Sequence, residues 1–286
     1  MNSPARSVAR PLTAFILIAF ALVSLVALPG ILKQQGLLSA DLPFEPFVIL
    51  GSWTPNIAAF MVLAFILRQK GGIRGLFRRW TMWRERPGWY LAALSPLGVA
   101  AAGALLFHLF DGTGPEPPEV FSLPVFAGIL VLSLVTGAMG EELGWRGFAL
   151  PRLQLRFQAL GASVVLGLLW GLWHLPLWFT GMGWEQMPFW LFTWVCVVAS
   201  VVMTWICNNT RGNMLLITLF HLFHNLGLNL MVMYWGVPME RVMTWLAIPL
   251  TLFALGVVLV YGQAGLRRKG PIPVDKTSGD WLRPGS

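Results

Sequence analysis

The stretch PFWLFTWVCVVASVVMTWIC, residues 188–207, decides the fold class, because it is twenty residues long and contains no charge. At about 1.5 Å per residue, a helix of this length crosses about 30 Å, the thickness of the apolar core of a membrane. The other comparably long and mostly apolar segments are 12–32, 47–67, 89–110, 123–143, 160–179, 213–235 and 242–262. The sequence therefore predicts an all-α, polytopic membrane protein with about eight transmembrane helices, which form a single domain over residues 1–262.

The composition excludes an ordinary soluble enzyme. Hydrophobic residues make up 56% of the 286 residues and charged residues only 11%, whereas a soluble domain carries about 25% charged residues. Charge is too scarce here to cover a surface that faces water, so lipid must surround most of the exterior. The two cysteines, Cys196 and Cys207, lie on one predicted helix about 16 Å apart and cannot form a disulfide with each other.

The basic residues predict the orientation. With eight spans and a cytoplasmic N-terminus, 18 of the 20 lysines and arginines fall on the cytoplasmic side, and only Lys33 and Arg241 fall outside. This bias follows the positive-inside rule, so both termini are predicted to be cytoplasmic (N-in/C-in). It explains the net charge of +8 without a nucleic-acid partner, and it suggests an integral protein of a bacterial plasma membrane, with lipid as a partner.

Two segments outside the spans also carry predictions. Residues 68–88 are too charged to cross a membrane, yet apolar residues recur there at helical spacing between arginines, at Ile73, Leu76, Phe77, Trp80 and Trp83. This pattern is typical of a basic amphipathic helix in the headgroup region of the cytoplasmic leaflet; a surface that recognises substrate is the alternative. Residues 263–286 are polar, and we expect a flexible cytoplasmic tail.

Ionisable side chains inside spans mark the candidate site, because each costs at least a few kcal/mol unless it serves a site or a buried partner. The fourth span ends with the motif Glu141-Glu142-x-x-x-Arg146. Glu142 and Arg146 are four residues apart, the spacing of an ion pair on one helix. Glu141 then has no local countercharge, which suits a general base. A charge cluster that ends the helix at the interface is the structural alternative.

Later spans add imidazole and amide groups. His174 lies in the fifth span, and His221, His224 and Asn225 lie in the seventh. His221 and Asn225 share one helix face, so both can donate hydrogen bonds to a developing oxyanion. A core histidine is the alternative for His174, and a helix–helix contact for Asn225. We interpret His224, and His108 near the outer end of the third span, as structural.

The order of these motifs resembles the CAAX prenyl protease and bacteriocin-processing family of intramembrane proteases, also called the abortive-infection family. After the glutamate motif come Trp170-x-x-x-His174 and His221-x-x-x-Asn225, within a core of about residues 120–230. The family usually has Phe at the first position of the second motif, where this chain has Trp170. The spacing is not that of soluble zinc proteases, because no H-E-x-x-H motif is present.

The resemblance implies a glutamate-dependent endopeptidase whose site lies inside the membrane and is reached from the cytoplasm. Glu141 would be the general base, with Glu142 as its partner, paired to Arg146. His174 would help to activate the water molecule. The implied substrates are prenylated CAAX proteins, or equally other peptides and membrane proteins. A proton-coupled or ion-coupled transporter and a catalytically idle scaffold of the same fold are the competing interpretations.

The resemblance also assigns His221 and Asn225 to the oxyanion. The family is described as metalloproteases, so zinc is an implied cofactor, with His174 and His221 as the ligands that would hold it. The same side chains can activate water without a metal, and the sequence favours neither.

The predicted spans leave one geometric difficulty. Glu141 lies near the cytoplasmic end of its span, and the other site residues lie nearer the midplane, about 12 Å away in depth. A shared site requires the fourth helix to sit deeper or to continue past Arg146. Gly137, Gly140 and Gly144 could permit a close approach or a break there.

Overall fold

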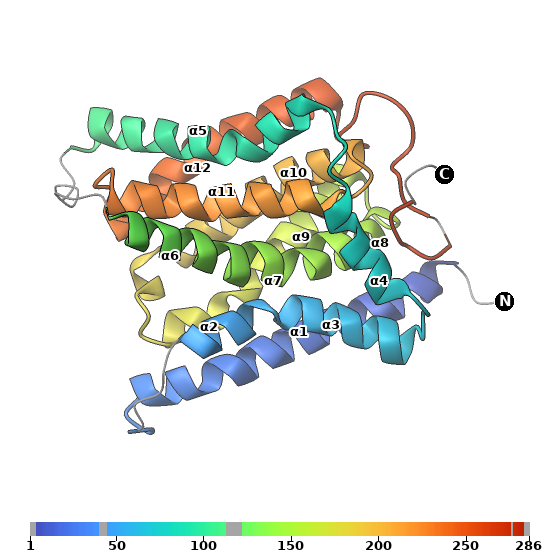
Figure 1. Ribbon diagram of the computed structural model, residues 1–286, viewed down its shortest axis with the longest axis horizontal. Coiled ribbons are helices and arrows are strands. Elements are labelled where there is room, and N and C mark those ends of the chain that lie inside the picture. The colour runs from blue at the N-terminus through green and yellow to red at the C-terminus, as the bar shows by residue number, and fades with distance from the viewer. Residues whose placement is uncertain (1–3, 40–44, 113–121, 276, 283–286) are drawn as a thin grey trace.

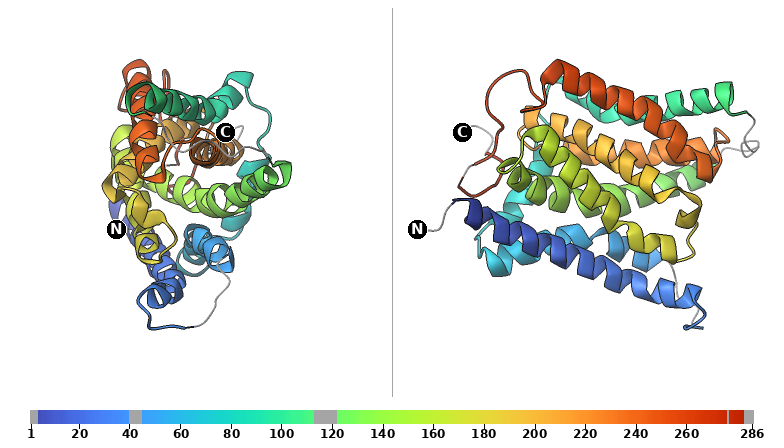
Figure 2. Two further views of the ribbon diagram at one scale, coloured as in Figure 1. Left: turned by 90° about the vertical axis from the view of Figure 1, so that its left-hand side faces the viewer. Right: turned by 180° about the vertical axis from the view of Figure 1, so that it is seen from behind.

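Long helices dominate the computed structural model, which describes residues 4–39, 45–112, 122–275 and 277–282 (Figure 1). In these ranges the secondary structure is helical, apart from one antiparallel bridge between Val274 and Trp281. The long helices run side by side, and both ends of the chain lie at the same end of the bundle (Figures 1 and 2). We call this the terminus end.

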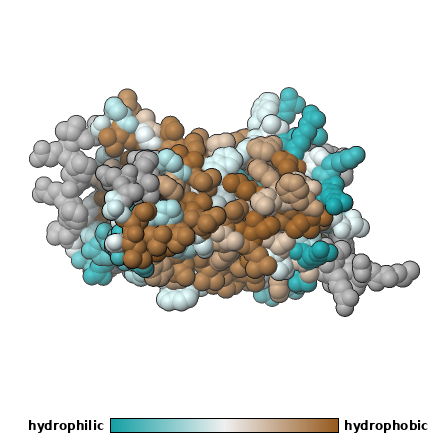
Figure 3. Space-filling view, turned by 90° about the horizontal axis from the view of Figure 1, so that it is seen from below, coloured by the Kyte–Doolittle hydropathy of each residue, from teal (hydrophilic) through white to brown (hydrophobic). Residues whose placement is uncertain are grey.

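Seven helical segments of the described chain are long and apolar enough to cross a membrane, and a bent pair brings the number to eight. The single helices are α1 (Pro4–Gln34), α5 (Pro87–Phe110), α10 (Phe189–Asn209), α11 (Met214–Met233) and α12 (Met239–Tyr261). Two more spans are composite, Leu123–Gln154 and Ala159–Phe179. Hydrophobic residues cover the middle of the surface and hydrophilic ones gather toward its ends (Figure 3). The prediction of an all-α polytopic membrane protein is confirmed.

The second span is broken. It consists of α2 (Glu45–Ser52) and of α3 (Thr54–Met61) with the π-helical turn η1 (Val62–Ile66), and its two halves bend by 45°. Pro55 lies in the first turn of α3, and it cannot donate the backbone hydrogen bond that would continue α2. The break brings α3 against the fourth span.

The fourth span is longer than predicted and contains two π-helical segments. α6 (Leu123–Ser133) leads into η3 (Leu134–Ala138), α7 (Met139–Glu142), η4 (Leu143–Ala149) and α8 (Leu150–Gln154). Since the helix continues past Arg146, the expected difference in depth between Glu141 and the other site residues disappears. π-Helical turns often occur at functional sites, and here they flank the two glutamates.

Glycines let both halves of the second span, α2 and α3, approach the fourth span. A Cβ atom on Gly144 would collide with the backbone oxygen of Pro55, and one on Gly140 would lie 2.8 Å from Ser52 Oγ.

The fifth span continues from α9 (Ala159–Trp173) into the 3₁₀ turn η5 (Leu175–Phe179), with η6 (Trp184–Gln186) in the connection that follows.

The segment after the second span forms less helix than predicted. Within 68–88, α4 (Gly72–Phe77) and the 3₁₀ turn η2 (Arg78–Thr81) are helical, and the chain is irregular up to α5. Trp80 Nε1 donates to Thr218 Oγ1 of α11 at 2.9 Å, whereas Trp83 is 62% exposed. The apolar face is therefore divided between the bundle and the exterior.

Of the predicted tail, residues 263–275 and 277–282 are described by the structure, and residues 276 and 283–286 lie outside the described residues. Described residues up to 282 fold back over the terminus end, and Trp281 is only 3% exposed. The indole lies against Gly212, where a Cβ atom would be 2.5 Å from Trp281 Cγ. Trp281 Nε1 also donates to the backbone oxygen of Arg146 at 2.8 Å. One buried aromatic residue thus anchors a segment whose average composition is polar.

Candidate active site

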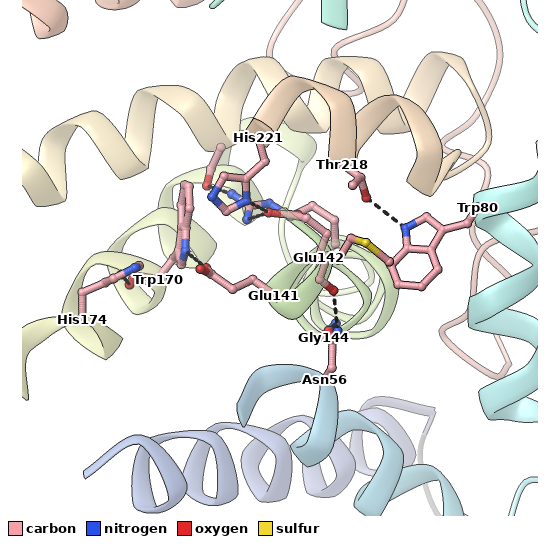
Figure 4. Close-up of polar contacts among 12 residues, drawn as sticks. Asn56, Trp80, Glu141, Glu142, Gly144, Trp170, His174, Thr218 and His221 are labelled. Carbon is pink, nitrogen blue, oxygen red and sulfur yellow. Dashed lines mark hydrogen bonds and ion pairs between the residues drawn. The ribbon is translucent and has the colours of Figure 1, made fainter. Parts of the chain in front are cut away.

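Three spans bring the predicted site residues together. Glu141 lies on α7, His174 caps the C-terminus of α9, and His221 lies on α11 (Figure 4). Asn225 follows one turn after His221 on α11. All four side chains line one cavity of about 370 Å³. Glu141, His174 and His221 are buried, and Asn225 is half-buried. The geometry therefore offers acidic, imidazole and amide groups to a single cavity.

Glu142 lies outside the cavity lining, and its carboxylate contacts two other side chains. Its Oε1 atom accepts a hydrogen bond from Arg146 Nη1 at 3.0 Å and contacts His221 Nδ1 at 2.6 Å. Arg146 Nη2 donates to Ser200 Oγ at 2.9 Å, and the guanidinium carbon lies 4.2 Å from the centre of the Trp170 ring. Glu142 and Arg146 are fully buried, so each charge depends on the other.

His221 and Asn225 are adjacent at the cavity wall. An ideal Cβ atom on Gly137 would lie 3.1 Å from His221 Nε2 and would collide with Asn225 Nδ2. Only a glycine therefore fits between these two groups and α6–α7. With Nδ1 directed at Glu142, His221 presents Nε2 beside the amide of Asn225.

Trp170 contacts two of the candidate catalytic groups. Its indole Nε1 donates to Glu141 Oε2 at 2.5 Å, and its backbone oxygen lies 2.8 Å from His174 Nδ1. A carbonyl only accepts, so Nδ1 of His174 carries the hydrogen and Nε2 of the neutral ring is an acceptor. The family usually has Phe at this position, and Phe has no N–H group that could donate to Glu141.

Asn56 is a site residue that the sequence analysis missed. It is fully buried on α3. Its Nδ2 atom donates to the backbone oxygen of Met139 at 2.8 Å, and its Oδ1 atom accepts from the backbone N–H of Gly144 at 2.8 Å (Figure 4). These two bonds flank the glutamates and satisfy backbone groups beside the π-helical turns. A lone asparagine in an apolar span is a signal that could have found it.

The other two histidines, His108 and His224, differ in their position relative to the cavity. His108 lies away from the cavity lining and its Nε2 atom contacts the backbone oxygen of Trp235 at 2.7 Å, in agreement with a structural residue. His224 is buried and also lines the cavity, which the structural interpretation did not predict.

The donor set does not fit the zinc site implied by the resemblance. Among the described residues, no three His, Cys, Asp or Glu side chains are grouped so that they could hold a metal ion, and zinc in proteins normally has at least three protein ligands. We therefore derive no step through a metal.

The cavity extends away from the terminus end. Its lining continues to residues at the opposite end of the bundle: Lys33 of α1, Phe47 of α2, Met182 and Trp184 of the connection after α9, and Met239 of α12 (Figures 1 and 2). The sequence predicts cytoplasmic termini and also a cavity that opens to the cytoplasm. These two predictions are incompatible, because the termini and the outer part of the cavity lie at opposite ends.

Fold and site together define an integral membrane protein with a sheltered cluster of carboxylate, imidazole and amide groups. Residues 122–227 match the family model described as type II CAAX prenyl endopeptidase, Rce1-like. This range contains all six residues of the predicted site. The CAAX prenyl protease 2 of Methanococcus maripaludis is 34% identical over 113 residues, which cover 37% of this chain and 41% of that protein. The chain thus spans about two fifths of the relative's length, and the resemblance drawn from the motifs is confirmed.

Proposed function

We propose that this protein is an intramembrane endopeptidase that hydrolyses peptide bonds of membrane-associated peptides or proteins. The observation that carries the proposal is the convergence of Glu141, His174, His221 and Asn225 on one cavity. Proton acceptors and hydrogen-bond donors are both needed for amide hydrolysis. The match to a family of prenyl endopeptidases over the same residues supports the same chemistry.

Glu141 and His174 activate the water molecule. Glu141 Oε2 accepts from Trp170, which leaves Oε1 to accept from a water, and His174 offers Nε2 as a second acceptor. The water oxygen attacks the carbonyl carbon of the scissile bond while its proton moves to Glu141. This carboxyl then returns the proton to the leaving amine, so that one group serves as base and then as acid.

Asn225 and His221 stabilise the oxyanion. The amide of Asn225 supplies an N–H donor at the cavity wall. Glu142 contacts His221 Nδ1 at 2.6 Å and fixes the orientation of the ring, so that Nε2 is held beside the amide of Asn225, where an Nε2–H would donate as well. Arg146 fixes Glu142 in place, so its contribution to this step is indirect.

The substrate class follows partly from the comparisons. A relative named CAAX prenyl protease 2 makes a prenylated C-terminal peptide one candidate. The other is a peptide or membrane-protein segment without a prenyl group, since the charge pattern suggests a bacterial plasma membrane and the cavity is lined by apolar side chains such as Val23, Leu177 and Val195.

The test is hydrolysis by purified protein in detergent, with quenched-fluorescent peptides that carry or lack a prenyl group. Glu141→Gln preserves the volume of the side chain but cannot take the proton, so cleavage should fall by about 10²–10⁴-fold. The matched control is His108→Ala, which lies away from the cavity and should retain activity. Cleavage at the wild-type rate by Glu141→Gln would exclude the mechanism.

A chelator tests the need for a metal. The wild-type rate should be unchanged when a chelator is added. A rate that the chelator lowers and that added zinc restores would show that a metal is required.

A further inference from the structure

Three observations bear on the end of the bundle at which the cavity opens, and the course of the cavity is the first. From Glu141 and His221 the lining passes Thr136 and Leu228 and reaches Lys33 and Met239. Lys33 is exposed at the C-terminal end of α1, and Met239 begins α12. Both helix ends lie opposite the terminus end (Figure 1).

The second observation is that packed side chains lie between the site and the terminus end. Arg146 and Phe148 are fully buried, and Arg152 is 1% exposed. Trp281 covers this layer from the tail and donates to the backbone oxygen of Arg146.

Arg79 attaches the tail to the bundle. Its guanidinium donates to the backbone oxygens of Arg211 and Trp281, at 2.7 Å each. Burial lowers the pKa of Arg79 to about 10, so it stays charged at neutral pH and both bonds persist. A substrate that approached from the terminus end would have to displace this layer.

The third observation is the distribution of charge. The start of α1, the segment around α4 and the α10–α11 turn lie at the terminus end, as does the described part of the tail (Figure 1). These segments carry most of the basic residues of the sequence. The opposite end has Lys33 and Arg241, and Arg241 lies 3.5 Å from Asp111. By the positive-inside rule the terminus end is cytoplasmic.

We infer that the active-site cavity opens on the non-cytoplasmic side of the membrane and receives extended, largely apolar peptide segments presented there. Such segments belong to exported peptides or to the outer parts of membrane proteins. That the incoming segment is a substrate rests on the proposed function. The side of the membrane on which the cavity opens does not depend on catalysis. It replaces the predicted cytoplasmic opening and retains the cytoplasmic termini.

Cysteine labelling tests the side of the opening. Both native cysteines are buried and free, and their replacement by alanine gives a background for single cysteines. Met182→Cys lies in the cavity lining, and Lys269→Cys lies exposed in the tail. In spheroplasts, a membrane-impermeant maleimide should label Met182→Cys at once and Lys269→Cys only after lysis. Labelling of Met182→Cys only after lysis would overturn the inference.

Sealed vesicles test the delivery of substrate. Proteoliposomes with the protein in known orientation receive an impermeant quenched-fluorescent peptide from outside. Molecules whose Met182 side faces outward should cleave it, and those with the tail outward should cleave it only after detergent is added. Cleavage by the tail-outward population alone would contradict the inference. If detergent-solubilised protein cleaves none of the peptides, the proposed function fails, while the labelling still decides the side of the opening.

Discussion

Glu141 and Glu142 are neighbours on α7, yet their carboxylates face two different regions of the molecule. Glu141 lines the cavity and accepts one hydrogen bond from Trp170. Glu142 faces the packed layer on the side of the terminus end, where Arg146 and His221 share its Oε1 atom. Adjacent residues on a helix point about 100° apart, so one short segment supplies both regions.

The two regions have different roles: side chains of the cavity region act on the substrate, and side chains of the packed layer stabilise the fold. Side chains of the cavity region keep atoms free for a substrate, so their removal should cost rate and leave the fold intact. Side chains of the packed layer, Arg146 among them, use their polar atoms on other protein groups, so their removal should cost stability first. Each prediction below tests whether this division holds.

The largest effect is expected from Arg146→Ala. The substitution leaves Glu142 buried without its cation, which typically costs about 3–5 kcal/mol. We expect a large loss of folded protein, measured as the monodisperse fraction in detergent and as a lower unfolding temperature. The double variant Glu142→Gln, Arg146→Met should recover most of the folded yield, because no lone charge remains. Full yield of Arg146→Ala with selective loss of turnover would move Arg146 to the cavity region.

Gly137→Ala should disable the cavity region without unfolding the protein. The new methyl group would collide with Asn225 Nδ2 and crowd His221 Nε2. Displacing one oxyanion donor lowers kcat by about 10²–10³-fold, and Asn225→Ala should show a similar loss. Gly128→Ala on α6 is the matched control, since nothing lies within 4 Å of a Cβ atom there. Equal activity of the two glycine variants would mean that Asn225 does not act in the reaction.

Asn56→Ala tests whether support for the glutamates extends to α3. It leaves the backbone oxygen of Met139 and the backbone N–H of Gly144 without their bonds to this side chain, and an unsatisfied buried group costs about 1–3 kcal/mol. We expect a lower unfolding temperature together with a reduced kcat and an unchanged KM. Asn56→Asp retains the acceptor for Gly144 and should recover part of kcat if the residue positions the glutamates. A stability loss with unchanged kcat would limit Asn56 to the fold.

Hydropathy and charge predict the spans well, since twenty apolar residues have few other stable environments. The break before Pro55, the π-helical turns and the docking of Trp281 were not predictable, because each depends on contacts between distant segments. Five of the six predicted site residues are ionisable and stand out in the sequence because such groups are costly in a membrane, whereas Asn225 is predicted from its helical spacing to His221. Asn56 acts through backbone bonds, and the role of Trp170 depends on a single indole N–H, so neither produces a spacing pattern.

The smallest effect is expected from Trp170→Phe, which sharpens the boundary between the two regions. The ring faces Arg146 in the packed layer, while its N–H bonds Glu141 in the cavity. Phe keeps an aromatic face for Arg146 and removes only the donor, so folded yield should stay near that of the wild type. A hydrogen bond to a charged group contributes about 1.5–3 kcal/mol, and Oε2 of Glu141 can bind water in its place. We therefore expect kcat/KM to fall about tenfold, measured with the fluorescent peptides beside a thermal unfolding curve. A large loss of stability with normal kcat/KM would place Trp170 wholly in the packed layer, and the bond to Glu141 would then have no part in catalysis.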